Sequence, residues 1–302
     1  MKLVEVTREA VFTGHKDCVY ALENGGSEKE FFTSGADGMV VLWNLDDSSL
    51  GNMVAKVANS VYALCYLNES KQILVGQNFE GVHLIDVENK KEIHSANITD
   101  SYIFDIKVCD KYIYVTCGNG FFIILSRSDL TVVSRIKLSD KSCRTMAVNP
   151  NLGVYALGFS DNSIKIFSFK KNQLLFNINA HQNSIFTLAF SNDGRFLFSG
   201  SRDAHLKVWD CENDFSLYKS IVAHMFAINN IQFNDDGTLF ATCSMDKSIK
   251  IWDAHNLTLL KVIDKARFAG HGTSVNKLLW KSNSTILSAS DDKNIVAWNL
   301  KF

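Results

Sequence analysis

The sequence predicts an all-β fold built from several copies of one small antiparallel sheet. An Asp followed six residues later by a Trp occurs four times along the 302 residues, each time with a Ser or Thr four residues before the Asp. The segments around these motifs are short, rich in β-branched and aromatic residues, and bounded by turn residues such as Asn192–Gly194. The tryptophans are also spaced by one repeat length or a multiple of it, as in stacked repeat architectures.

The composition is typical of a globular protein and does not favour binding to polyanions. Hydrophobic residues make up 46% and charged residues 21%, and 31 basic residues against 32 acidic ones leave a net charge of −1. Nucleic-acid binding needs many uncompensated cations, so this balance disfavours it. No apolar run approaches the ~18 residues of a membrane span. The first residues also lack the apolar core of a secretory signal.

The repeat length gives the number of units. Trp209 and Trp252 are 43 residues apart, and Trp252 and Trp298 are 46 apart. Trp43 precedes Trp209 by 166 residues, which is four periods of 41.5, so three degenerate repeats are expected between them. The residues at the tryptophan position in these three are Ile85, Leu125 and Phe167. The count is therefore seven.

Each repeat contains four expected strands. In the fifth repeat these are Ile185–Phe190, Arg195–Ser199, Leu206–Trp209 and Ser216–Val222. Four short strands cannot bury both faces of their sheet alone, so neighbouring units must stack. A period of ~40–45 residues with four strands is typical of a propeller. We expect a single seven-bladed β-propeller over 1–302, with blades at about 14–56, 57–98, 99–138, 139–180, 181–222, 223–266 and 270–302.

These motifs resemble the WD-repeat β-propeller family, and the resemblance covers essentially the whole chain. Four copies have a His 21 or 22 residues before the motif's Asp, with a Ser or Thr between them and the Trp after it. The resemblance implies a chain of hydrogen bonds from the indole through the hydroxyl and the imidazole to the carboxylate. The four sets are His15, Thr33, Asp37 and Trp43; His181, Ser199, Asp203 and Trp209; His224, Thr242, Asp246 and Trp252; and His271, Ser288, Asp292 and Trp298.

The resemblance also implies how the ring closes. The seventh repeat ends at Trp298–Phe302, directly after its third strand, so its outermost strand is missing. Leu3–Phe12 is a strand-like stretch without a partner of its own. In the family, the N-terminal segment supplies the missing strand. Closure of this kind removes the exposed sheet edges that promote aggregation.

A catalytic interpretation of the His, Ser and Asp sets is the alternative to a structural one. Four repetitions argue against catalysis, because an enzyme needs one site whereas a repeat fold needs the same stabilising contacts in each blade. We call each hydrogen-bonded set of this kind a lock. Where the Trp is lost, the His and the Ser or Thr are lost with it, as in Val57, Val75 and Ile85. We therefore expect blades two to four to be the less stable arc. Asp161 survives without a histidine, and we interpret it as a turn cap.

Metal or phosphate sites are not indicated by the remaining residues. His83, His94, His205 and His255 have no metal-ligand spacing and are expected to face solvent. Seven cysteines form no Cys-x-x-Cys pair, which favours free thiols in a reducing compartment. We expect no cofactor and no metal, and a cytoplasmic or nuclear location.

The expected binding surface is the upper rim of the propeller. In the family, the positions three and five residues after the histidine, and the one before the turn aspartate, commonly face this rim. The fifth-position series contains four aromatic residues and an arginine, the types that dominate binding hot spots. Ordinary packing between blades is the competing interpretation. The rim residues are Tyr20, Tyr62, Tyr102, Phe104, Arg144, Phe186, Arg202, Asn229, Met245, Asn276 and Asp291.

The sequence thus favours a non-enzymatic scaffold or adaptor that binds a protein or peptide, as part of a larger complex, and no membrane. Two alternatives stay open. One is an enzyme or small-ligand binder with a site at the mouth of the central channel. The other is a nucleic-acid or anion sensor using the rim arginines, which the net charge disfavours.

Overall fold

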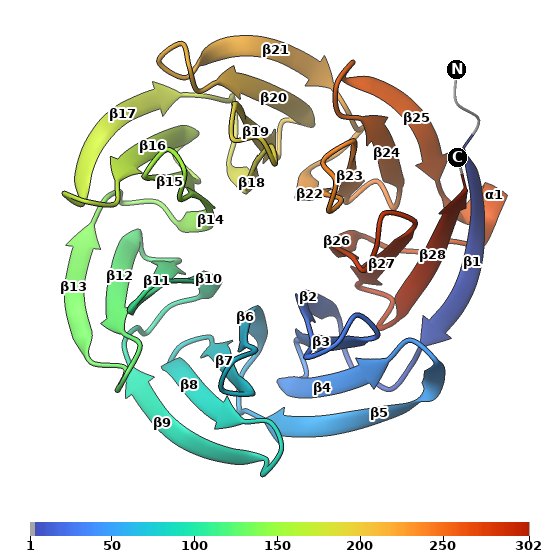
Figure 1. The fold of residues 1–302 in the computed structure, drawn as a ribbon, viewed down its shortest axis with the longest axis horizontal. Helices are drawn as coiled ribbons and strands as arrows, with labels where there is room; N and C mark the ends of the chain where they lie inside the picture. Colours follow the sequence, from blue (N-terminus) through green and yellow to red (C-terminus); the bar gives the residue numbers. More distant parts are fainter. Residues whose placement is uncertain (1–3, 302) are drawn as a thin grey trace.

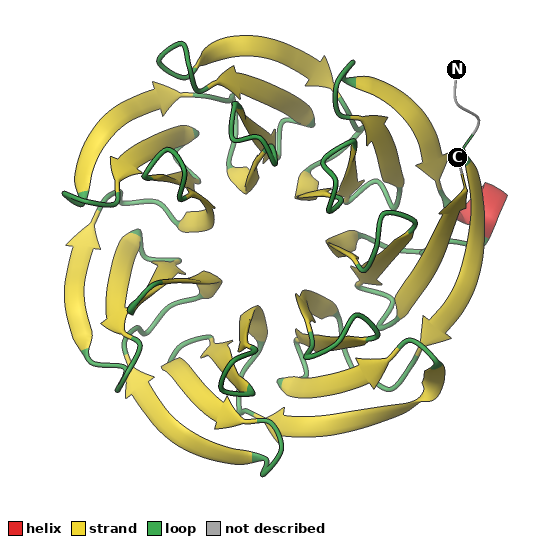
Figure 2. Ribbon diagram, in the orientation of Figure 1, coloured by secondary structure: helices red, strands yellow, loops and turns green. Residues whose placement is uncertain are grey.

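Seven four-stranded antiparallel sheets surround a central channel in the computed structural model, which describes residues 4–301 (Figure 1). The predicted all-β, seven-bladed propeller is thereby confirmed. Strands make up nearly all of the regular structure, and the single short helix α1 (Lys265–Phe268) lies outside the ring (Figure 2). Among these residues no helix is long and apolar enough to cross a membrane.

In blades one to six the strands follow the chain from the channel outward, and blade seven takes its outermost strand from the N-terminus. Blade one holds β2 (Val19–Asn24), β3 (Glu30–Gly35), β4 (Met39–Asn44) and β5 (Asp47–Lys56), and blade two holds β6 (Val61–Leu67), β7 (Gln72–Gln77), β8 (Gly81–Asp86) and β9 (Lys91–Asn97). Blade three holds β10 (Ile103–Cys109), β11 (Tyr112–Cys117), β12 (Phe121–Ser126) and β13 (Val132–Lys137), and blade four holds β14 (Cys143–Asn149), β15 (Val154–Phe159), β16 (Ser163–Ser168) and β17 (Gln173–Asn179). Blade five holds β18 (Ile185–Phe190), β19 (Phe196–Ser201), β20 (His205–Asp210) and β21 (Ser216–Val222), and blade six holds β22 (Ile228–Phe233), β23 (Leu239–Ser244), β24 (Ile249–Asp253) and β25 (Thr258–Ile263). Blade seven holds β26 (Val275–Trp280), β27 (Thr285–Ser290), β28 (Ile295–Lys301) and the N-terminal β1 (Glu5–Phe12).

The N-terminal strand closes the ring, as predicted. β1 pairs with β28 in the sheet order β1-β28-β27-β26, with Phe12 opposite Ile295 (Figure 1). The fully buried ring of Phe12 also lies 5.0 Å from the Phe31 ring and 5.7 Å from the Trp43 ring, both in blade one. One strand thus completes the last sheet and packs against the first. Leu3 and Phe302, included in the predicted bounds, lie outside the described residues.

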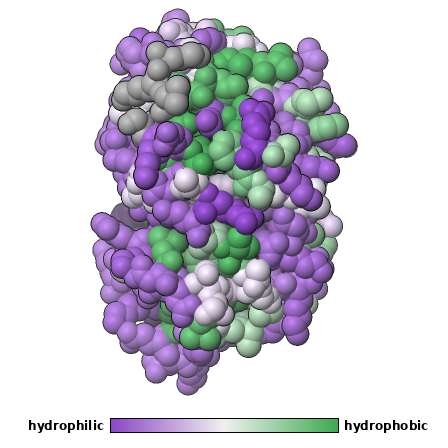
Figure 3. All heavy atoms as spheres, turned by 90° about the vertical axis from the view of Figure 1, so that its right-hand side faces the viewer, coloured by the Kyte–Doolittle hydropathy of each residue, from purple (hydrophilic) through white to green (hydrophobic). Residues whose placement is uncertain are grey.

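Apolar side chains fill the spaces between successive blades. The cluster between blades five and six includes the buried Phe198, Phe240 and Trp252. The rings of Phe240 and Trp252 stack with centroids 5.7 Å apart. Each blade therefore buries its two faces against its neighbours, which is why the repeat must be closed into a ring. The outer wall that carries β1 and α1 is a mosaic of hydrophilic residues and smaller hydrophobic patches (Figure 3).

Polar side chains connect the innermost strands of some neighbouring blades. The Thr187 hydroxyl on β18 accepts from the Ile231 N–H at 3.1 Å. The Asn230 side-chain oxygen on β22 accepts from the Leu278 N–H at 3.1 Å. A backbone N–H that is buried without a hydrogen-bond partner costs free energy of folding. These side chains supply the missing acceptors and hold adjacent blades in register.

Candidate functional site at the channel mouth

Four blades contain a continuous hydrogen-bonded set of Trp, Ser or Thr, His and Asp. In blade five, Trp209 Nε1 lies 2.8 Å from Ser199 Oγ, that oxygen lies 2.7 Å from His181 Nε2, and His181 Nδ1 lies 3.0 Å from Asp203 Oδ2. The same three distances are 2.8, 2.7 and 2.9 Å in blade one (Trp43, Thr33, His15, Asp37), 3.0, 2.8 and 2.8 Å in blade six (Trp252, Thr242, His224, Asp246), and 2.8, 2.8 and 2.9 Å in blade seven (Trp298, Ser288, His271, Asp292).

The direction of each bond follows from donor chemistry. An indole N–H can only donate, so the Ser199 oxygen accepts it and gives its own hydrogen to His181 Nε2. The neutral imidazole then carries its hydrogen on Nδ1 and donates it to Asp203. Burial lowers the pKa of His181 and outweighs the raising effect of Asp203, which keeps the ring neutral. The hydroxyl is fully buried and fully bonded, so the geometry favours a structural lock over a nucleophile.

The degenerate blades replace the polar set with apolar packing. Val75 and Ile85 are buried in one cluster, against which Val57 packs. In blade four, Asp161 accepts from the Ser163 N–H at 3.0 Å, which is a turn cap. It also accepts from the Ser139 hydroxyl at 2.6 Å, with Ser139 at the histidine position. Ser139 thus partly replaces the missing imidazole, a contact that the turn-cap interpretation did not include.

One expectation about the scattered histidines is wrong. His83 is buried on β8, with Nδ1 2.7 Å from Glu92 Oε2, rather than facing solvent. Burial follows from its place on the third strand of a blade, where side chains on both faces meet neighbouring blades or the outer strand. Residues 4–301 contain no group of three or more His, Cys, Asp or Glu side chains arranged to hold a metal ion.

A β-bulge near the start of every innermost strand directs one side chain to the channel mouth. The sheet register shifts between Val19 and Ala21 in β2, and between Ile103 and Asp105 in β10. The same shift occurs in the other five inner strands. A bulge leaves one residue unpaired and changes where its side chain points. The unpaired residues are Tyr20, Tyr62, Phe104, Arg144, Phe186, Asn229 and Asn276, which is the entire fifth-position series.

These seven side chains and Lys277 together line a cavity of about 230 Å³, which we call the mouth cavity. Five of them contact one another in a row, which we call the ladder. The Tyr20 and Tyr62 ring centroids are 4.6 Å apart, and those of Tyr62 and Phe104 are 5.8 Å apart. The Arg144 guanidinium then lies 4.2 Å from the Phe104 centroid and 4.3 Å from that of Phe186. Lys277 was not predicted, because it stands six residues after His271 and so outside the three rim positions of the repeat.

Two amides complete the circle of residues at the mouth. The Asn229 side chain donates to Val275 O at 2.8 Å and to Ser274 Oγ at 3.0 Å. The Asn276 side chain donates to Val19 O at 2.9 Å and to the Asp291 carboxylate at 2.7 Å. Both amides therefore join neighbouring blades.

Exposed apolar residues surround the mouth cavity. Tyr102 is 40% exposed, and its ring lies 4.7 Å from the ring of Phe79, which is 50% exposed. Phe79 occupies the turn-aspartate position of blade two with a left-handed φ of 63°. On blade six, Met245 is exposed as the sequence predicted. Met225 and Phe226 are exposed beside the lock histidine, at positions that the family offsets did not include.

Of the remaining predicted rim residues, Arg202 is exposed at the turn of blade five, where its backbone N–H bonds to Ser184 O. Asp291, at the equivalent turn of blade seven, is only partly exposed. The structure therefore brings the fifth-position series into one cavity and leaves Tyr102, Arg202 and Met245 around it on the rim.

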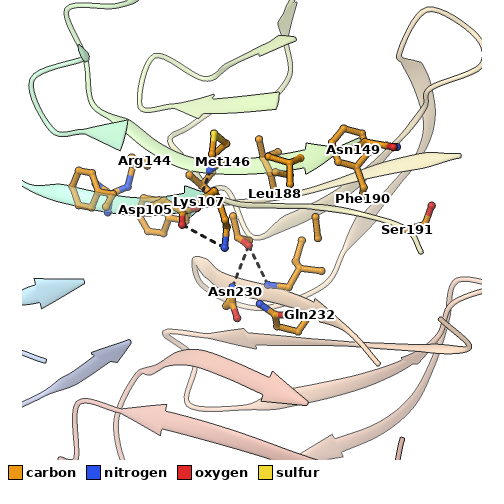
Figure 4. Close-up of a pocket in the computed structure, with 18 of the residues that line it drawn as sticks. Asp105, Lys107, Arg144, Met146, Asn149, Leu188, Phe190, Ser191, Asn230 and Gln232 are labelled. Atoms are coloured by element: carbon orange, nitrogen blue, oxygen red, sulfur yellow. Dashed lines mark hydrogen bonds and ion pairs between the residues drawn. The ribbon is translucent and has the colours of Figure 1, made fainter. Parts of the chain in front are cut away.

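Below the mouth, four charged side chains from three blades face the channel. They are the acidic Glu23 and Asp105 and the basic Lys107 and Lys277. Lys107 Nζ lies 3.6 Å from Asp105 Oδ1, and this carboxylate raises the pKa of Lys107 (Figure 4). Burial raises the pKa of Glu23 and lowers the pKa of Lys277. A second cavity of about 320 Å³ lies along blades three to six, with Arg144 at one end and Ser191 at the other (Figure 4). The four charges offset one another, whereas Arg144 at the mouth has no carboxylate partner among residues 4–301.

Comparisons with known proteins agree with this architecture. A family model described as "WD domain, G-beta repeat" matches residues 7–44, 172–210, 215–253 and 263–299, about half of the chain. Striatin-3 from Homo sapiens is 22% identical over 200 residues, covering 66% of this chain and 22% of that protein. A WD repeat-containing protein 91 homolog from Dictyostelium discoideum is 25% identical over 224 residues, covering 68% of this chain and 28% of that protein. The chain thus spans about a quarter of the length of these relatives.

A solved structure of the WD40 β-propeller domain of Doa1 superimposes with a TM-score of 0.86 at 17% identity, covering 98% of this chain and 97% of that one. This likeness concerns the fold alone. The unmatched stretch between residues 44 and 172 contains the three blades that lack the Trp, His and Ser or Thr pattern.

Proposed function

The chain belongs to the WD-repeat family, and on this premise we propose that it is a protein-interaction scaffold that binds a protein or peptide at the upper rim of its propeller. The upper rim is the end of the channel at which the innermost strands begin. The curated relatives, striatin-3 among them, support a scaffold role.

The ladder at the mouth cavity carries the proposal. Tyr20, Tyr62, Phe104 and Phe186 are all half-buried, so part of each ring is packed and part is exposed. Aromatic rings and arginine held in place by packing are the residues that contribute most to protein interfaces, because little conformational entropy is lost on binding. Fixed side chains at seven bulges make the mouth a preformed receptor.

The surrounding rim would extend this contact. Tyr102 with Phe79 on one side, and Met245 with Met225 and Phe226 on the other, place exposed apolar groups beyond the mouth. Exposed apolar groups of this size around a polar-lined cavity are typical of interaction surfaces. Asn229 and Asn276 would shape the floor, since their amides already bond within the ring.

A non-enzymatic role is part of the proposal. The hydroxyls nearest to histidines are buried within the locks, and Lys107 in the channel already pairs with Asp105. The described residues that line the mouth cavity include no serine, cysteine, histidine or carboxylate that could act as a nucleophile with its base. We also propose a cytoplasmic or nuclear location, supported by the free thiol state of all seven cysteines.

Affinity capture from lysate of the source organism tests the rim. The variant Tyr62→Ala/Phe104→Ala removes the centre of the ladder, and we expect it to lose most of the proteins that the wild-type chain captures. The matched control is Leu217→Ala/Tyr218→Ala on the outer strand β21, where both side chains are at least half exposed. Equal capture by the ladder variant and by wild type, with unchanged thermal unfolding, would refute the proposal.

A further inference from the structure

The Arg144 side chain is held between two aromatic rings from the two neighbouring blades. Phe104 lies on β10 of blade three and Phe186 on β18 of blade five, with Arg144 on β14 between them. The guanidinium carbon lies 4.2 Å from the Phe104 ring centroid and 4.3 Å from that of Phe186, so the cation contacts both rings. Cation–π contacts with two rings restrict the orientation of the group, and its N–H donors remain able to bind a further partner.

No carboxylate among residues 4–301 pairs with this guanidinium. The charged or titratable groups that influence Arg144 are Tyr62 and a second cation, Arg202. The Asp105 carboxylate is already paired with Lys107 and accepts a hydrogen bond from the Met146 N–H. Burial lowers the pKa of Arg144 to about 10, so the group stays charged at neutral pH while it has lost part of its hydration. A cation in this state gains more from an ion pair than a solvated one.

We propose that Arg144 binds a carboxylate side chain, Asp or Glu, from an acidic peptide segment of the protein partner. This inference rests on the proposed function and names the chemistry that the mouth selects. A planar guanidinium matches a carboxylate through two parallel hydrogen bonds. The rings of Tyr20 and Tyr62 continue the ladder beside it and offer an apolar surface to the neighbouring peptide residue.

The mouth does not favour a polyanion. Asp291, which Asn276 holds at blade seven, adds a negative charge on the far side of the ring from Arg144. The channel below is balanced by two acids and two bases, and the whole chain has a net charge of −1. One carboxylate next to apolar groups fits these charges better than a chain of phosphates.

Selection from a phage-displayed random dodecapeptide library tests the inference. With wild-type protein we expect enriched peptides that share Asp or Glu at one position beside an apolar residue. A synthetic peptide of that motif, with both ends blocked, should bind about 10- to 100-fold more weakly when its acidic residue is changed to the amide. In Arg144→Gln the same peptide change should have no effect. The matched control Arg135→Gln changes an exposed arginine on the outer strand β13, away from the mouth cavity, and should behave as wild type.

Two further arms identify the source of the charge. Blocking the peptide's C-terminal carboxylate should leave its affinity unchanged, and phosphoserine in place of the acidic residue should not raise it. The variant Arg144→Lys retains the charge without the two-pronged edge, and it should bind the acidic peptide at least several-fold more weakly than wild type. It also serves if Arg144→Gln fails to fold.

The outcomes separate this inference from the proposed function. The carboxylate assignment is overturned if the enriched peptides share no acidic residue. It is also overturned if changing the acidic residue to the amide weakens peptide binding to Arg144→Gln as much as it does to wild type. The scaffold proposal then stands as long as binding is lost in Tyr62→Ala/Phe104→Ala. Loss of affinity on blocking the C-terminus, or a gain with phosphoserine, overturns the assignment too. If no enriched peptide loses binding in Tyr62→Ala/Phe104→Ala, the result contradicts both the carboxylate assignment and the scaffold proposal.

Discussion

The Nδ1 atom of His181 lies 3.0 Å from Oδ2 of Asp203 at the rim of blade five, and the histidine is buried and neutral. Burial alone would raise the pKa of Asp203. Hydrogen bonds from His181 and from the Gln182 N–H outweigh that effect and lower it. The pair therefore consists of a neutral imidazole donating to an ionised carboxylate, and both members favour the folded state when the pH is not acidic.

Acidification should reduce stability in two ranges. The folded-state pKa values of His181 and His224 are lowered, so below about 6.5, the ordinary histidine value, the unfolded chain binds more protons. Stability is then lost as the pH falls from that value through the folded pKa. The carboxyls of Asp203 and Asp246 also have lowered pKa values, and their contribution is lost below about 4. Urea unfolding at pH 8, 6, 4.5 and 3 measures both ranges. Equal stability at pH 8 and 4.5 would contradict the histidine range, and equal stability at pH 4.5 and 3 would contradict the carboxyl range.

Blade four suggests how a lock can be removed with little loss. Ser139, Leu157 and Phe167 occupy the positions of His181, Ser199 and Trp209. We expect each single change in blade five to destabilise by about 1–3 kcal/mol, because its partners stay buried without bonds. The triple variant His181→Ser/Ser199→Leu/Trp209→Phe should lose at least about 1 kcal/mol less than the sum of the singles. Additive losses in denaturant unfolding would show that the set is not a unit.

Hydrogen exchange should distinguish the two arcs of the ring. Blades two to four lack the complete polar set, so we expect the second-strand amides of β7, β11 and β15 to exchange faster than those of β19, β23 and β27. Mass spectrometry of peptic fragments resolves these strands. The slowest exchange in blades two to four would exclude the locks as the source of local stability.

The closing strand depends on one aromatic side chain. Phe12 is fully buried between Phe31 and Trp43, so Phe12→Ala should lower the free energy of unfolding by about 3–5 kcal/mol. The matched control Glu9→Ala changes an exposed residue of the same strand and should alter stability by less than about 0.5 kcal/mol. Thermal unfolding and size-exclusion chromatography test both variants. Similar losses in the two would mean that the ring does not depend on this contact.

The lock residues could be predicted because they recur at fixed offsets. His15 and Asp37 are 22 residues apart, as are His181 and Asp203, and the structure joins both pairs. His83 shows the opposite case. It occurs once, without a repeated partner, so its contact with Glu92 across two paired strands had no counterpart from which it could be inferred.

At the mouth, spacing along the chain was sufficient to select the seven fifth-position residues, since strand length and turn chemistry repeat in every unit. Spacing along the chain did not predict how these side chains meet in one cavity. The bulge that turns Tyr62 or Arg144 inward, and the two rings that enclose the guanidinium, depend on how separate blades pack. Local sequence specifies strands and turns because those follow from nearby residues. Contacts between blades depend on the closed ring, which brings together residues dozens of positions apart.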